Sequence, residues 1–185
     1  FQIHTKETAP EASRATLEAT AKKYGFLPNL FGVFAESPTA VQAYAAINQA
    51  LEQSALSPVE QQVVALTVSV TNDCAYCVGA HSMVAQMVHM PEDMLAALRD
   101  QKPLSDKKLN ALRTLVLSLM FHRGWVPEQD LEHFVAAGYT RRHVLDVITL
   151  LALKTLSNYA NHIAQTPLDP QFASHAWSAK GAAVA

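Results

Sequence analysis

Cysteine is almost absent from this sequence, which has only two among 185 residues, Cys74 and Cys77. Secreted disulfide scaffolds contain more cysteines and spread them along the chain, so that class of protein is excluded. Two cysteines separated by two residues close a loop that is too small to stabilise a fold through chain entropy. The pair is therefore better explained by chemistry than by a structural disulfide bond.

Long hydrophobic runs and charge of one sign are also lacking. The most apolar stretch, 144–156, is short and contains Asp146 and Lys154, so we expect no membrane span, and no segment resembles a signal peptide. The net charge is −2 at pH 7 and no basic stripe is present, which argues against nucleic acid or a membrane surface as a partner. We therefore expect a cytoplasmic protein.

Apolar residues, in contrast, make up 50% of the chain, which excludes an intrinsically disordered protein. A chain of 185 residues is long enough for one domain with a substantial core, and we expect a single domain over 1–185. We also expect a homo-oligomer, because many amphipathic helices in a chain of this size leave more apolar surface than one core absorbs.

Helix start and stop signals predict an all-α fold of about eight helices. The segment SPVE, residues 57–60, combines an N-cap serine, a proline at the first helical position and the Ser-x-x-Glu form of a capping box. N-caps are expected at Ser37, Ser57, Asp73, Ser105 and Thr140. The expected helices are 10–25, 38–52, 58–70, 74–88, a short one from 91, 105–124, 127–138 and 140–166, and 30–35 is a short apolar piece. The tail beyond Lys180 is small and apolar and is expected to fray.

One segment has a second interpretation. Residues 63–70, VVALTVSV, are rich in β-branched side chains and could form a buried strand. The capping box before them and the lack of a second strand favour a helix. The strand alternative would make the chain a thioredoxin-like disulfide oxidoreductase.

The chemistry is concentrated in the pattern Cys74-x-x-Cys77-x-x-x-His81. Free amide groups and the positive end of the dipole at a helix start stabilise a thiolate, which is the reactive form of cysteine. His81 lies four residues after Cys77, on the same helical face, where it can accept a proton from the thiol or hold the thiolate. Cys74 is placed to resolve an oxidised Cys77 into a disulfide.

Other interpretations of the pair remain open. A c-type haem site needs His directly after the second cysteine, where this chain has Val78. Zinc could use Cys74, Cys77 and His81, but a second ligand pair at short spacing is missing. The two cysteines could also be inert residues of a core helix, because free cysteine often acts as a small hydrophobe. We expect no cofactor and no metal.

The segments LSPVE, residues 56–60, and NDCAYCVGAH, residues 72–81, resemble the core of the AhpD-like alkyl hydroperoxidases of the carboxymuconolactone decarboxylase superfamily. The resemblance covers about 56–98, the expected redox core, and LSNYANH, residues 156–162, is similar to a segment of a peroxidase-related branch. It implies an all-helical fold, a trimer or hexamer, and thiol peroxidase or disulfide reductase activity in antioxidant defence. The expected partners are a dithiol reductant or a peroxiredoxin.

The resemblance also implies roles for single residues. Cys77 would be the nucleophile that forms the sulfenic acid, and Cys74 the proton donor and resolving cysteine. His81 would connect the pair to a glutamate twelve residues before the first cysteine, but Gln62 occupies that position. Glu60 is a possible replacement, although two residues turn a helix by about 200° and its capping-box role is at least as plausible.

Two further alternatives concern function and the last long helix. The chain could be a redox sensor without turnover that uses the cysteine pair only as a switch. Lys154, Asn158 and Asn161 form a stripe on the last long helix. This stripe is either a solvated face or a buried polar network, or else a wall of the thiol pocket or a contact between subunits.

Overall fold

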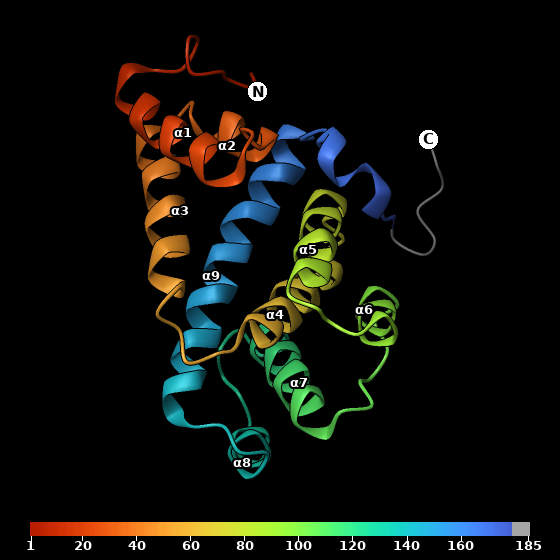
Figure 1. Ribbon diagram of the computed structural model, residues 1–185. Helices are drawn as coiled ribbons and strands as arrows, with labels where there is room; N and C mark the ends of the chain where they lie inside the picture. Colours follow the sequence, from red (N-terminus) through yellow and green to blue (C-terminus); the bar gives the residue numbers. More distant parts are fainter. Residues whose placement is uncertain (179–185) are drawn as a thin grey trace.

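The computed structural model describes residues 1–178, and their regular secondary structure is entirely helical, as predicted (Figure 1). The tail beyond Lys180, where fraying is expected, lies outside the described residues. Instead of about eight helices, residues 1–178 form nine α-helices and one 3-10 helix. The short apolar piece 30–35 is largely helical, and the 3-10 helix is not predicted by the sequence signals. These elements are α1 (Glu11–Tyr24), α2 (Asn29–Phe34), α3 (Pro38–Leu51), α4 (Pro58–Thr71), α5 (Ala75–Met87), α6 (Glu92–Arg99), α7 (Lys107–Phe121), α8 (Glu128–Ala136), α9 (Arg141–Ala164) and η1 (Pro170–His175).

The helix boundaries follow the serine, proline and glycine signals of the sequence. The Ser37 side chain caps α3, and α1 ends at Gly25, whose φ of 79° is the left-handed conformation that glycine adopts without strain. The expected N-cap at Ser105 is wrong by one residue. Asp106 caps α7 instead, because its carboxylate accepts a hydrogen bond from the Leu109 N–H at 2.8 Å.

The β-branched segment 63–70 is part of α4, and all eight of its residues are buried. α4 packs against α5, α7 and α9, which surround it in the middle of the molecule (Figure 1). A helix that is hydrophobic on all sides is stable where neighbouring helices cover it, and here tertiary packing overrides a weak helix propensity. The strand alternative, and with it the thioredoxin-like interpretation, is therefore wrong.

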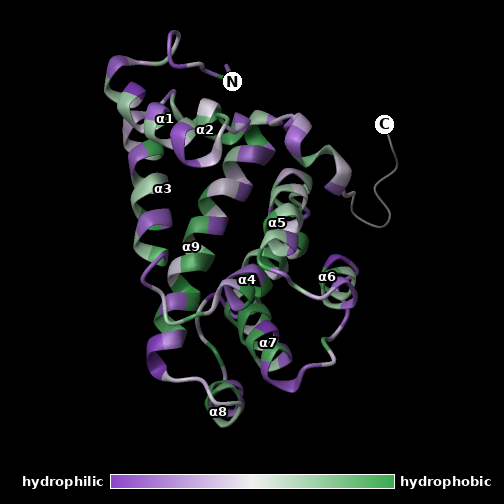
Figure 2. Ribbon diagram, in the orientation of Figure 1, coloured by the Kyte–Doolittle hydropathy of each residue, from purple (hydrophilic) through white to green (hydrophobic). Residues whose placement is uncertain are grey.

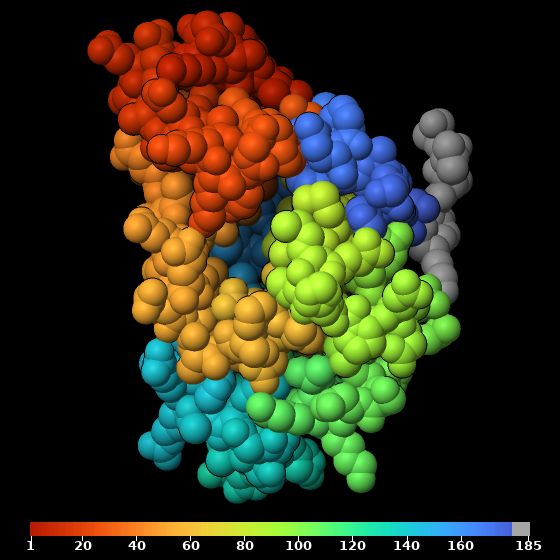
Figure 3. Space-filling model, viewed as in Figure 1, coloured from red at the N-terminus to blue at the C-terminus, as the bar shows by residue number. Residues whose placement is uncertain are grey.

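α9 is the longest helix, with 24 residues, and it lies against α3, α4 and α2. Hydrophilic residues alternate with hydrophobic ones along it (Figure 2). None of the helices within residues 1–178 has both the length and the apolar character needed to cross a membrane. Between α3 and α5 the surface is hollowed, and α9 forms the floor of this hollow (Figure 3).

Candidate active site

The turn between α4 and α5 places both cysteines at the start of α5. Asp73 has a φ of 52°, in the left-handed region, and the Cys74 N–H donates to the Ser69 carbonyl oxygen at 2.9 Å. Cys74 itself is therefore the N-cap residue of α5, and the expectation that Asp73 caps this helix is wrong. Cys77 lies in the first turn, where the amide groups of the helix start favour an anion.

Both sulfur atoms are buried and neither is in a disulfide bond. Burial alone raises the pKa of Cys77, but the hydrogen bond from Cys74 and the positive charge of Lys154 outweigh it and hold this pKa well below its usual value. The pKa of Cys74 is raised, because its thiol is hydrogen-bonded to Cys77 and is buried. The two pKa shifts have opposite signs, so the site favours the thiolate at Cys77 and the thiol at Cys74.

Three residues of α9 line the cysteine pair. Asn161 Nδ2 donates to Cys77 Sγ at 3.3 Å and lies 3.9 Å from Cys74 Sγ. Ser157 Oγ lies 3.8 Å from Cys77 Sγ, and Lys154 is buried beside the pair with 1% of its surface exposed. The inward side of the polar stripe is thus a wall of the thiol site, while Asn158 belongs to a separate contact and accepts a hydrogen bond from Asn72 Nδ2 at 3.0 Å.

Lys154 connects the thiolate to His81. Burial lowers the pKa of Lys154, but the negative charge of Cys77 outweighs burial and raises it, so that the ammonium is retained. Its Nζ lies 2.7 Å from His81 Nε2, and an ammonium group can only donate, so Nε2 accepts this hydrogen bond. The proton of the neutral ring is therefore on Nδ1, which donates to Gln62 Oε1 at 2.8 Å.

This arrangement differs from the expected relay. His81 is neutral because burial lowers its pKa and the Lys154 charge lowers it further. Both of its ring nitrogens are hydrogen-bonded, one to Lys154 and one to Gln62. The ring is therefore connected to the Cys77 sulfur through Lys154. Gln62, where the resemblance implies a glutamate, is a hydrogen-bond acceptor for His81.

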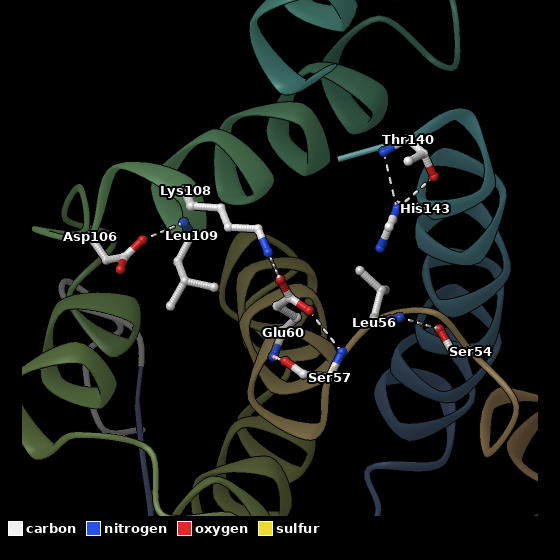
Figure 4. Close-up of polar contacts among 9 residues, drawn as sticks. All are labelled: Ser54, Leu56, Ser57, Glu60, Asp106, Lys108, Leu109, Thr140 and His143. Atoms are coloured by element: carbon white, nitrogen blue, oxygen red, sulfur yellow. Dashed lines mark hydrogen bonds and ion pairs between the residues drawn. The ribbon is translucent and has the colours of Figure 1, made fainter. Parts of the chain in front are cut away.

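The structure places Glu60 in the capping box and not beside His81. Glu60 Oε2 accepts a hydrogen bond from the Ser57 N–H at 2.8 Å, and Ser57 Oγ accepts one from the Glu60 N–H at 3.3 Å (Figure 4). The other carboxylate oxygen of Glu60 forms an ion pair with Lys108 Nζ at 3.1 Å (Figure 4). The predicted capping box is confirmed, and the proposed use of Glu60 as relay acid has no support in its contacts.

Asp169 holds the cysteine-containing turn in place, a role that the sequence did not predict. The hydroxyl group of Tyr76, between the two cysteines, donates to Asp169 Oδ2 at 2.6 Å, and Asp169 is 3% exposed. The Asn29 N–H at the start of α2 donates to Asp169 Oδ1 at 3.0 Å. This carboxylate, just before η1, connects the start of α2 to α5. Because Asp169 and Asn29 are 140 residues apart in the sequence, no local sequence pattern predicts their contact.

Within residues 1–178 no three histidine, cysteine, aspartate or glutamate side chains are grouped so that they could hold a metal ion. The ligand set considered for zinc is interrupted by Lys154, because His81 Nε2 faces the ammonium group.

Residues 38–117 match the model of the Carboxymuconolactone decarboxylase family. No match is found among curated protein sequences. The chain is similar to a solved structure described as an alkylhydroperoxidase AhpD core, an uncharacterized peroxidase-related protein from Ralstonia eutropha JMP134. The TM-score is 0.83 at 22% identity, and 93% of each chain is covered.

Two further solved structures show the same fold. An uncharacterized peroxidase-related protein from Silicibacter sp. TM1040 has a TM-score of 0.76 at 20% identity, covering 88% of this chain and 87% of that one. The debrominase Bmp8, in complex with 2,3,4-tribromopyrrole, has a TM-score of 0.76 at 12% identity, covering 94% of each chain. At these identities the likeness concerns the fold, and function has to be argued from the site.

Proposed function

We propose that this chain is a thiol-dependent peroxidase or disulfide reductase with an antioxidant role, because residues 38–117 match the Carboxymuconolactone decarboxylase family model and the fold is similar to that of an AhpD-like protein. One observation carries the proposal. The buried Cys77 sulfur accepts a hydrogen bond from Asn161, and Cys74 and the Lys154 ammonium group lower its pKa, whereas the pKa of Cys74 is raised. Two inert core cysteines would need neither a buried ammonium group nor a buried amide beside them.

The reaction uses each cysteine once. The Cys77 thiolate attacks a peroxide oxygen, the O–O bond breaks, and Cys77 becomes a sulfenic acid while the peroxide is reduced to an alcohol or water. The Cys74 thiol then condenses with the sulfenic acid, forming the disulfide and releasing water. A dithiol then reduces the disulfide and restores the pair, and in the disulfide reductase role the restored pair passes its electrons on to a partner peroxiredoxin. The natural compartment for this cycle is the cytoplasm, where thiols are kept reduced.

Steady-state turnover tests this proposal directly. The purified protein should consume an alkyl hydroperoxide continuously in the presence of dithiothreitol and release the alcohol. The double variant Cys74→Ser/Cys77→Ser is the matched control and should show only the rate of the buffer. A wild-type rate equal to that of the double variant would overturn the proposal and favour a redox sensor that oxidises without turnover.

We also propose a homo-oligomer, a trimer or hexamer. Large apolar side chains are unusually exposed near the end of α7 and on α9, including Phe121 at 83%, Trp125 at 88% and Ile163 at 72%. Exposed apolar groups of this kind are typical of surfaces that another subunit covers. Sedimentation velocity at micromolar concentration should show an assembly, and Trp125→Glu should shift it toward the monomer. A wild-type monomer under these conditions would contradict the proposal.

A further inference from the structure

Asn161 has a free hydrogen-bond acceptor inside the thiol site. Its Nδ2 faces the sulfur of Cys77, which requires a donor, so its Oδ1 points away from that sulfur. Oδ1 is buried and has no hydrogen-bond partner among the described residues, and Asn161 is only 4% exposed. An unpaired buried acceptor is destabilising, and a bound group with an O–H or N–H would give it a hydrogen-bond partner.

Lys154 supplies the complementary donor. It is 1% exposed, and its ammonium group has His81 Nε2 as a partner on one side and stabilises the Cys77 thiolate on the other. The neutral His81 ring, held by Gln62, fixes the direction of the ammonium group. Besides the Cys74 thiol, the Lys154 ammonium group therefore carries a proton beside the reacting sulfur, and His81 is a positioning residue.

We propose that Asn161 Oδ1 and Lys154 Nζ together bind the –O–O–H group of a hydroperoxide, and that Lys154 is the general acid of its reduction. This inference rests on the proposed peroxidase function and deepens it. The terminal O–H donates to Asn161 Oδ1, and the oxygen that carries the organic group accepts from Lys154. Two such contacts require a free O–H on the peroxide, so the site selects hydroperoxides over dialkyl peroxides.

The proton balance follows from this placement. Cys77 attacks the oxygen that carries the hydrogen, the O–O bond breaks, and the departing alkoxide takes a proton from the Lys154 ammonium. The products are the alcohol, a neutral Lys154 amine and the sulfenic acid, whose O–H still donates to Asn161. When a dithiol later reduces the disulfide, its two protons restore the Cys74 thiol and the Lys154 ammonium.

The test compares two oxidants that differ in their need for an acid. tert-Butyl hydroperoxide releases an alkoxide, which needs a proton, whereas peracetic acid releases a carboxylate, which does not. Sulfenic acid formation is followed by stopped flow at a pH at which alkylation shows Cys77 to be a thiolate in every variant. Because Cys77 is then a thiolate in every variant, a difference in rate between variants cannot come from a difference in the amount of thiolate.

Lys154→Gln should slow the reaction with tert-butyl hydroperoxide by about 10²- to 10⁴-fold, the range of general acid catalysis, and the reaction with peracetic acid much less. Lys154→Arg should recover the charge but not the full rate, because a guanidinium group does not give up its proton. Lys22→Gln, on the exposed face of α1, is the matched control and should react as the wild type does with both oxidants.

Asn161→Leu provides the second arm. Both oxidants carry the terminal O–H, so this variant should slow both reactions, unlike Lys154→Gln.

An equal loss with the two oxidants in Lys154→Gln would show that Lys154 acts only through the thiolate. That result would overturn the inference and leave the peroxidase proposal standing. A wild-type protein no faster than free cysteine with either oxidant would overturn both.

Discussion

Cys77→Ser is expected to abolish sulfenic acid formation and reduce peroxide turnover to the buffer rate, whereas Cys74→Ser should form a sulfenic acid that is not resolved. The reason is the unequal protonation of the pair, since the pKa of Cys77 is well below its usual value and that of Cys74 is raised. A dimedone-type reagent and mass spectrometry detect the sulfenic acid and locate it. A label on Cys74 in the Cys77→Ser protein would reverse the assignment.

Glu60→Gln is a useful control for the cysteine variants. It removes a carboxylate from the neighbouring helix, but this carboxylate belongs to the capping box and to the ion pair with Lys108. The variant should lose about 0.5–2 kcal/mol of stability, as helix caps do, with turnover within about twofold of the wild type. A slow enzyme with unchanged melting would mean that Glu60 reaches the thiols during the reaction.

The largest loss of stability is expected for Asp169→Ala. The change leaves the Tyr76 hydroxyl group and the Asn29 N–H without their buried acceptor, and hydrogen bonds to a charged group contribute about 1.5–3 kcal/mol each. A total loss of about 3–5 kcal/mol in the free energy of unfolding should follow, measured by urea denaturation with far-UV circular dichroism.

Tyr76→Phe separates the two contacts of this carboxylate. It keeps the ring but removes the hydroxyl group, which donates to Asp169 and accepts a hydrogen bond from the Leu30 N–H at 3.3 Å, so it should cost at least half as much as Asp169→Ala. The double variant should be less destabilised than the sum of the two single variants, because the residues share one hydrogen bond. A loss below about 1 kcal/mol in Asp169→Ala would show that the carboxylate contributes little to the docking of α2.

Much of the helical plan was predictable because its signals are local. Proline at a helix start, glycine after a helix end and the Ser57–Glu60 capping box act within a few residues, and they set the bounds of α1, α3 and α4 within one or two positions. The misplaced caps at Asp73 and Ser105 are errors of one residue, because two neighbouring polar side chains compete there and the backbone conformation decides between them.

The residues that surround the cysteine pair were harder to predict from the sequence. The cysteine pair and His81 are visible in the sequence because they follow one another along α5. Lys154 and Asn161 come from α9, more than seventy residues later, and their spacing fits a polar surface as well as a pocket wall. Which side of α9 faces inward depends on its packing against α3 and α4, and that packing is a property of the whole fold.

The burial of α4 on all sides has a consequence for how the protein is made. α4 is covered by α5, α7 and α9, and α9 begins only at Arg141. Chains are synthesised from the N-terminus, so the apolar segment 63–70 leaves the ribosome long before its last partner exists. Until α9 has been translated, the nascent chain presents a nearly uncharged, β-branched helix to chaperones and proteases. Truncation before Arg141 should therefore yield an insoluble product rather than a smaller folded one.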